Sequence, residues 1–431
     1  MTYRIPFCLT VITRHNIPHP TDTSPTFRYV HFAYSPKHKH MSILKKAIKI
    51  LSSLLLGGII GMTISTAAIV LFTDTTIQEF IGKLTRIDIT DAIVSASVGV
   101  LCFIVSIPIL ILLHEAGHLV CGLLTGYRFV SFRIFNITFI KHNNRIRIKR
   151  FSVAGTGGQC LLTPPDMSET KMPTMLYNAG GIIANLLALF AVLPALWLPS
   201  HPFVKEFAVI FIITDIFIIL TNTIPMKING IGNDGHNILA LHNNTKGKRA
   251  LALQLRLNAL LQEGVRPKDM PKELFGEDND TDYSNPMEVA IPIANASRLV
   301  DEMKWHEALS AFEELYSHKS EIIKLYADEI ACELVFLSLI TGNTEKAIQL
   351  YSDELKKYIS AYRKVMSSKE RILCAIALFM DHDEPKARDI YDNLVKRKEA
   401  YLLQGEVKSD LAIMENMLGI RTSGNEETET T

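Results

Sequence analysis

The sequence predicts an all-α polytopic membrane protein with four transmembrane helices, a small membrane-associated β-hairpin and a soluble α-helical domain at its C-terminal end. Three features lead to this prediction. Long apolar runs are confined to the first half of the 431 residues and are long enough to cross a bilayer as helices. A segment between the second and third runs alternates apolar and polar residues, as half-buried strands do. The second half is charged and has the apolar spacing of soluble helices.

The four predicted spans cover about 50–72, 92–124, 175–198 and 207–224. The first belongs to an uncleaved anchor over 41–75, because no cleavage site follows a short apolar core. Residues 1–40 are polar and lack periodicity, so we expect them to be disordered or to be an over-long start upstream of Met41.

Basic residues set the expected orientation in the cell membrane. They lie before the first span, between the second and third, and after the fourth, whereas the loop after the first span has few. The positive-inside rule therefore predicts a multi-pass protein with both termini in the cytoplasm. A net charge of +1 gives no indication of nucleic-acid binding.

Residues 129–153 predict a β-hairpin that turns at residues 142–144, followed by a glycine-rich loop over 155–166. The loop lacks the Lys-Ser/Thr of a phosphate loop. Two interpretations of the hairpin stay open. It is an ordinary surface hairpin, or it is an edge strand at the membrane surface that pairs with an extended substrate.

The second span contains the pattern His-Glu-x-x-His, formed by His114, Glu115 and His118. Residues four apart share one helix face, so the two histidines can hold one zinc ion. Glu115 lies about 100° round the helix and can take a proton from a zinc-bound water. A charged residue in an apolar helix costs about 2.5–3.5 kcal/mol, so it is usually functional. The alternative is two histidines hydrogen-bonded within a helical bundle.

A catalytic zinc ion needs a third protein ligand. The candidate is Asp234, which follows the fourth span and is expected at the depth of the two histidines. Asp215 is a rival inside the fourth span, where it would lie deeper in the membrane. His236 is a second rival, and Asp234 could instead cap a helix.

The motif H-E-A-G-H in a membrane helix, followed by N-x-x-P at Asn222–Pro225 and by Asp234-Gly235, resembles the site-2 protease family of intramembrane zinc metalloproteases. The resemblance covers about 92–239, including the helix segment N-A-G-G-I-I-A-N at 178–185. It implies that Asp234 is the third ligand of one Zn²⁺ per chain. The hairpin is similar to the membrane-associated β element of that family. Asn233 departs from the family, in which this position is commonly apolar.

The resemblance implies a zinc metalloendopeptidase core over 92–244. It would hydrolyse peptide bonds of membrane-embedded proteins or peptides near the cytoplasmic face, with Glu115 as the catalytic base. Asn185 and Asn222 are candidate donors to the substrate or the oxyanion, or they bond helices together. One alternative is a membrane-anchored scaffold with a structural or inactive zinc site. Another is a processing enzyme for small exported peptides.

The rest of the chain predicts a linker region over 245–290, a cytoplasmic helical domain over 291–420 and a disordered tail over 421–431. Small residues recur about forty positions apart in the helical domain, each followed four residues later by an aromatic residue. The pairs are Ala308 and Phe312, Ala347 and Tyr351, and Ala387 and Tyr391. This pattern resembles tetratricopeptide repeats, although their period is about 34, and a generic helical bundle remains an alternative. Such a domain could bind a cytoplasmic protein partner.

Overall fold

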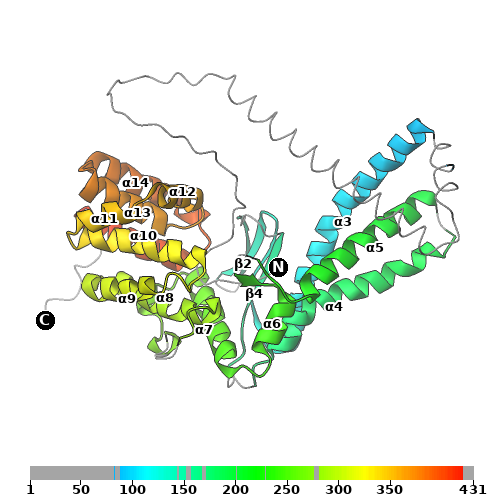
Figure 1. The fold of residues 1–431 in the computed structure, drawn as a ribbon, viewed down its shortest axis with the longest axis horizontal. Coiled ribbons are helices and arrows are strands. Elements are labelled where there is room, and N and C mark those ends of the chain that lie inside the picture. The colour runs from blue at the N-terminus through cyan, green and yellow to red at the C-terminus, as the bar shows by residue number, and fades with distance from the viewer. Residues whose placement is uncertain are drawn as a thin grey trace. The chain divides into compact units, whose positions relative to one another are not determined.

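The computed structural model describes residue 82 and residues 88–142, 145–151, 157–166, 171–199, 201–228, 230–275 and 281–420. The predicted disordered start, the first predicted span and the predicted disordered tail lie outside the described residues. From Cys102 onward, the described residues belong to one compact unit. Most of them are helical (Figure 1).

The helices of the apolar half and the elements that follow them have these bounds: α3 Ile89–Leu124, α4 Thr174–Val192, α5 Pro202–Thr223, α6 Asp234–Leu241 and α7 Thr245–Glu263. The helices of the C-terminal half are α8 Pro286–Asp301, α9 Trp305–Ser317, α10 Lys324–Ile340, α11 Thr344–Leu350, α12 Asp353–Tyr362, α13 Ser368–Ala375, α14 Glu384–Arg397 and α15 Gln404–Met417. The strands are β1 Arg128–Ile134, β2 Ile137–His142, β3 Arg145–Arg150, β4 Gly158–Thr163, β5 Lys227–Ile228 and β6 Ile231–Gly232.

Two described helices are long and apolar enough to cross a membrane, Ile93–Leu124 and Thr174–Leu196. They coincide with the second and third predicted spans. The fourth predicted span coincides with α5, which is not one of these two and which carries Lys205, Glu206 and Asp215. The prediction of four transmembrane helices is therefore confirmed only as far as two candidate helices.

Helices α3 and α4 touch through their backbones. A Cβ atom added at Gly117 would lie 2.1 Å from the carbonyl oxygen of Gly180, and one added at Gly180 would lie 2.4 Å from that of Gly117. Such close contact requires glycine on both helices, as is common where helices pack in membranes. This contact places the next residue of α4, Gly181, against the imidazoles of His114 and His118.

The sheet differs from the predicted hairpin. It has four antiparallel strands in the order β3-β2-β1-β4. The alternating segment that predicted one long strand is broken between β1 and β2, where Phe135 adopts a left-handed backbone with φ of 50°. The glycine-rich segment predicted to be a loop contains β4, whose residues 160–162 are buried as Cys-Leu-Leu. The predicted hairpin is present as β2 and β3, which pair antiparallel on either side of the predicted turn. The sheet is larger than predicted because a tight turn at Phe135 interrupts the alternating pattern without changing it.

Helix α7 lies within the segment that the sequence predicts to be a linker. Its leucines and alanines, among them Leu251 and Leu255, are buried in one apolar cluster with residues of β1 and β4. Part of the predicted linker is therefore a core helix that packs on the sheet.

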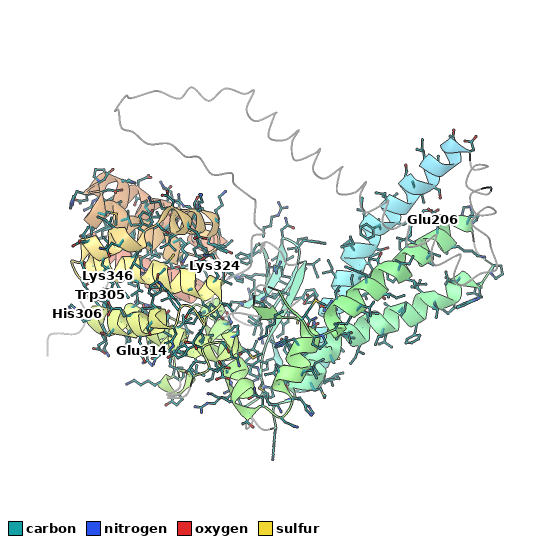
Figure 2. All side chains as sticks on the ribbon, viewed as in Figure 1. Glu206, Trp305, His306, Glu314, Lys324 and Lys346 are labelled. Atoms are coloured by element: carbon teal, nitrogen blue, oxygen red, sulfur yellow. The ribbon has the colours of Figure 1, made fainter. Side chains whose placement is uncertain are left out.

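The C-terminal half is helical, as predicted. Ala308, Ala347 and Ala387 are fully buried, which agrees with their place on the inner faces of neighbouring helices. Their assignment to tetratricopeptide repeats stays a prediction. Exposed charged side chains of these helices include Glu314 and Lys324 (Figure 2). Lys324, for example, lies 3.1 Å from Asp328 and 3.2 Å from Glu354.

Candidate metal centre

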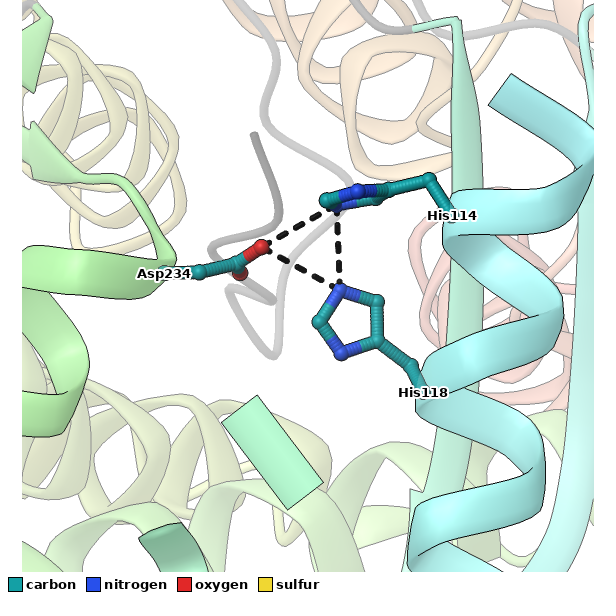
Figure 3. A group of neighbouring side chains, drawn as sticks. All are labelled: His114, His118 and Asp234. Atoms are coloured by element: carbon teal, nitrogen blue, oxygen red, sulfur yellow. Dashed lines mark hydrogen bonds and ion pairs between the residues drawn. The ribbon is translucent and has the colours of Figure 1, made fainter. Parts of the chain in front are cut away.

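Three buried side chains from two separate helices converge on one point (Figure 3). Asp234 Oδ2 lies 3.0 Å from His114 Nε2 and 3.2 Å from His118 Nε2, and the two Nε2 atoms are 3.2 Å apart. None of the three residues is more than 5% exposed. We call this group the His-His-Asp cluster. A group of two imidazole nitrogens and one carboxylate oxygen could hold a metal ion.

The other ring nitrogen of each histidine faces a protein oxygen. His114 Nδ1 lies 2.8 Å from Asn185 Oδ1, and His118 Nδ1 lies 2.8 Å from the main-chain carbonyl of Tyr177. An oxygen acceptor at Nδ1 selects the tautomer that carries its proton there, which leaves the Nε2 lone pair free. Both histidines are therefore oriented as metal ligands are.

The carboxylate is positioned by the residue before it. Asn233 caps helix α6 by accepting from the main-chain N–H of His236, and it also accepts from Met226 N–H. Its amide donates to the carbonyls of Thr221 and Ile224 at the end of α5. The residue that departs from the family pattern thus ties α6 to α5 and fixes Asp234 at the first position of the helix.

Glycine is required beneath the cluster. A Cβ atom added at Gly181 would lie 2.5 Å from His114 Nε2 and 2.6 Å from His118 Nε2. Any side chain at this position would therefore occupy the side of the imidazoles on which a ligand must sit. The bare backbone, the free Nε2 lone pairs and the anionic oxygen together fit a divalent metal ion.

Glu115 is 3% exposed and lies against the start of β4. A Cβ atom added at Gly158 would lie 2.5 Å from its Cγ and 2.8 Å from its Oε1. Its Oε2 is buried and has no hydrogen-bond partner in the described part of the chain. A buried carboxylate oxygen of this kind is costly unless it serves a reaction or a ligand.

Burial, followed by the charge of Lys227, lowers the pKa of His236.

The structure does not bring all candidate residues together. Asp215 lies behind Asn185 and is not in the cluster, and neither is His236. Asn222 donates to the carbonyl of Ile218 in its own helix. Both ends of the Asn185 amide bind protein groups, so its predicted role toward a substrate stays a prediction.

Sequence reasoning missed three contributions to the site. These are the Tyr177 carbonyl, the bare face at Gly181 and the hydrogen bonds of Asn233. Gly181 left a trace in the sequence as part of a small-residue helix segment, and Asn233 did so only as a departure from the family pattern.

No protein-family model matches this chain, and neither a curated protein nor a solved structure matches it. The resemblance to site-2 proteases therefore rests on the motifs and their spacing.

Proposed function

We propose that the protein is a zinc-dependent intramembrane protease of the site-2 type, which cleaves membrane-embedded proteins or peptides near the cytoplasmic face. The convergence of His114, His118 and Asp234 is the observation that supports it most directly. The three ligand atoms come from residues that span 120 positions of the sequence, and two of them belong to the His-Glu-x-x-His motif, which is typical of zinc hydrolases. A structural zinc site would have no use for the adjacent Glu115.

The exposed surfaces of α3, α4 and α5 support a membrane location. Large apolar side chains on all three are more than half exposed, including Ile104, Leu187 and Phe217. A belt of this kind is unfavourable in water and matches the hydrocarbon core of a bilayer. Helix α5 is the fourth predicted span, and its apolar face would complete that belt.

The His-His-Asp cluster would hold the zinc ion through His114 Nε2, His118 Nε2 and Asp234 Oδ2. When bound, zinc supplies a Lewis acid that lowers the pKa of a bound water to about 7 and polarises a peptide carbonyl. Glu115 takes the proton of the attacking water and passes it to the leaving amine as the C–N bond breaks. Because its Oε2 has no hydrogen-bond partner among the described residues, that oxygen is free to accept the proton.

A substrate helix hides its carbonyls in hydrogen bonds, so it must unwind before cleavage. Strand β3 is an edge of the sheet and exposes Ile146 and Ile148, each about two-thirds exposed. An extended peptide can pair with the main chain of such an edge. The sheet therefore offers a place to hold the unwound segment.

The test is to compare wild-type protein with Glu115→Gln in cells whose membrane proteome is analysed for fragments. We expect fragments that depend on Glu115, together with unchanged zinc content in the purified variant. Glu206→Gln is the control, because this carboxylate lies on α5 outside the cluster. Identical fragments in wild type and Glu115→Gln would contradict the protease and favour the scaffold alternative.

A further inference from the structure

Asp215 lies in the middle of the apolar helix α5 and is fully buried. Its Oδ1 accepts a hydrogen bond of 2.7 Å from Asn185 Nδ2. Its Oδ2 has no hydrogen-bond partner in the described part of the chain. A carboxylate in such a helix is expensive to insert and is usually retained for a function. The hydrogen bond to Asn185 connects Asp215 to His114, because the same amide also faces the His114 ring.

The contact determines which way the Asn185 amide points. A carboxamide has a donor end and an acceptor end that are nearly equal in shape, so either could face His114. An ionised carboxylate only accepts hydrogen bonds. Asp215 therefore holds the NH₂ group on its own side, and the carbonyl oxygen of Asn185 must face His114 Nδ1.

The direction of the amide in turn determines the tautomer of His114. An oxygen at 2.8 Å from Nδ1 requires the proton on Nδ1, so the Nε2 lone pair is available to a metal ion. A flipped amide would donate to Nδ1 and favour the proton on Nε2. That proton would point at Asp234 Oδ2, 3.0 Å away, and the resulting hydrogen bond would compete with metal binding.

The tautomer of His118 does not depend on a side-chain amide. His118 Nδ1 faces the main-chain carbonyl of Tyr177, and a main-chain carbonyl inside a helix cannot exchange places with a donor. Of the two histidines, only His114 has a tautomer that depends on a side-chain amide whose donor and acceptor ends can exchange places.

We propose that Asp215 is a positioning residue that locks the Asn185 amide and thereby keeps His114 in its metal-binding tautomer. This inference rests on the metal centre of the proposed function, but it does not depend on proteolysis. Its readout is zinc affinity, measured by competition with a chelator on the purified full chain in detergent.

Three variants test the lock. Asp215→Leu removes the acceptor and should weaken zinc binding about 10–100-fold, as loss of a group that orients a ligand usually does. Asn185→Asp should also weaken it, because two carboxylates would then face each other. The double variant Asn185→Asp/Asp215→Asn should restore affinity to near wild type. Its residue 185 can only accept from His114, and its residue 215 can donate to residue 185.

Thr214→Val is the matched control. Thr214 neighbours Asp215, is also buried and donates only to the carbonyl of Ile210 in its own helix. Its replacement should leave zinc affinity unchanged.

The inference fails if Asp215→Leu binds zinc as tightly as Thr214→Val, or if the double variant binds no tighter than Asn185→Asp. Thermal unfolding of each variant identifies loss of the fold, and zinc affinities are compared among variants that unfold at the wild-type temperature. Restored zinc affinity without any cleavage that depends on Glu115 would contradict the protease and leave the lock intact.

Discussion

The His-His-Asp cluster and the C-terminal helices both bury charged side chains, but they do so in different ways. In the C-terminal half, Arg371 Nε lies 2.7 Å from Asp410, and Arg371 Nη2 lies 2.7 and 2.9 Å from the two oxygens of Glu333. Lys369 Nζ lies 2.7 Å from Glu329 on the same helix pair. We call these five residues the ion network. Each carboxylate there has a permanently charged cation beside it.

The cluster in α3 and α6 brings together acceptors instead. Two imidazole nitrogens that their own hydrogen bonds leave unprotonated face one carboxylate oxygen, each within 3.2 Å. Three lone pairs at this distance repel unless a cation or a proton joins them. Burial of a charged side chain therefore does not by itself identify a metal site. A metal site is identified by whether the neighbouring groups are cations that neutralise the buried carboxylate or further lone pairs that point at the same spot.

The largest expected effect is loss of the metal on removing its anionic ligand. Asp234→Ala should lower zinc affinity by at least about 100-fold, since both the charge and a ligand atom are lost. Metal analysis of the purified chain measures this. Asp410→Asn in the ion network should keep its zinc, and loss of zinc in both variants would break the distinction between the two regions.

Removing the cation of the ion network should destabilise the fold without touching the metal. Arg371→Ala leaves Glu333 and Asp410 buried without their partner, which should lower the free energy of unfolding by about 3–5 kcal/mol. Thermal unfolding followed by the fluorescence of Trp305, which packs against Phe336, reports it. Lys386→Ala removes an exposed pair with Asp381 and should cost less than about 1 kcal/mol. Equal losses of unfolding free energy in Arg371→Ala and Lys386→Ala would contradict this prediction.

A smaller effect should follow from filling the bare face beneath the histidines. Gly181→Ala places a methyl group against both Nε2 atoms and should weaken zinc binding about tenfold or more. Leu187→Ala, on the exposed side of the same helix, should leave zinc affinity unchanged in the same chelator competition. Wild-type affinity in Gly181→Ala would mean that the metal does not sit on that side.

The smallest effect concerns a carboxyl beside the ion network. Burial, followed by the charges of Asp410 and Glu329, raises the pKa of Glu406 well above its ordinary value. The folded chain therefore binds this proton more tightly than the unfolded chain, so stability falls as the pH rises above about 4.3. Glu406→Gln should stabilise by about 0.5–2 kcal/mol at pH 8 and have little effect at pH 4. Thermal unfolding at both pH values tests this, and equal shifts at the two would contradict it.

The sequence predicted what depends on local spacing. His114, Glu115 and His118 follow from one helical turn, and the long apolar runs predicted α3 and α4. Asp234 was a candidate because of its expected depth in the membrane, with Asp215 and His236 as rivals, and the resemblance selected it, since nothing local links residues 114 and 234. The structure brings these two together because Asn233 bonds to carbonyls at the end of α5, which no spacing rule expresses.

Other features depended on tertiary contacts. The alternating pattern did not reveal the turn at Phe135, because a left-handed residue there keeps the alternation on both sides. Helix α7 was predicted as linker because its polar residues hide a leucine-rich face, which is buried only through packing on the sheet. The Tyr177 carbonyl could not be predicted, because any residue supplies one.

Helix α7 contacts the two elements that hold or border Asp234 and Glu115. It follows and contacts α6, which begins with Asp234, and it packs on β4, whose first residue, Gly158, borders Glu115. Helices α8 and α15 of the C-terminal half pack on α7 in turn. Under the proposed function, a partner that binds the C-terminal helices would therefore act on the proposed ligand Asp234 and the proposed base Glu115 together.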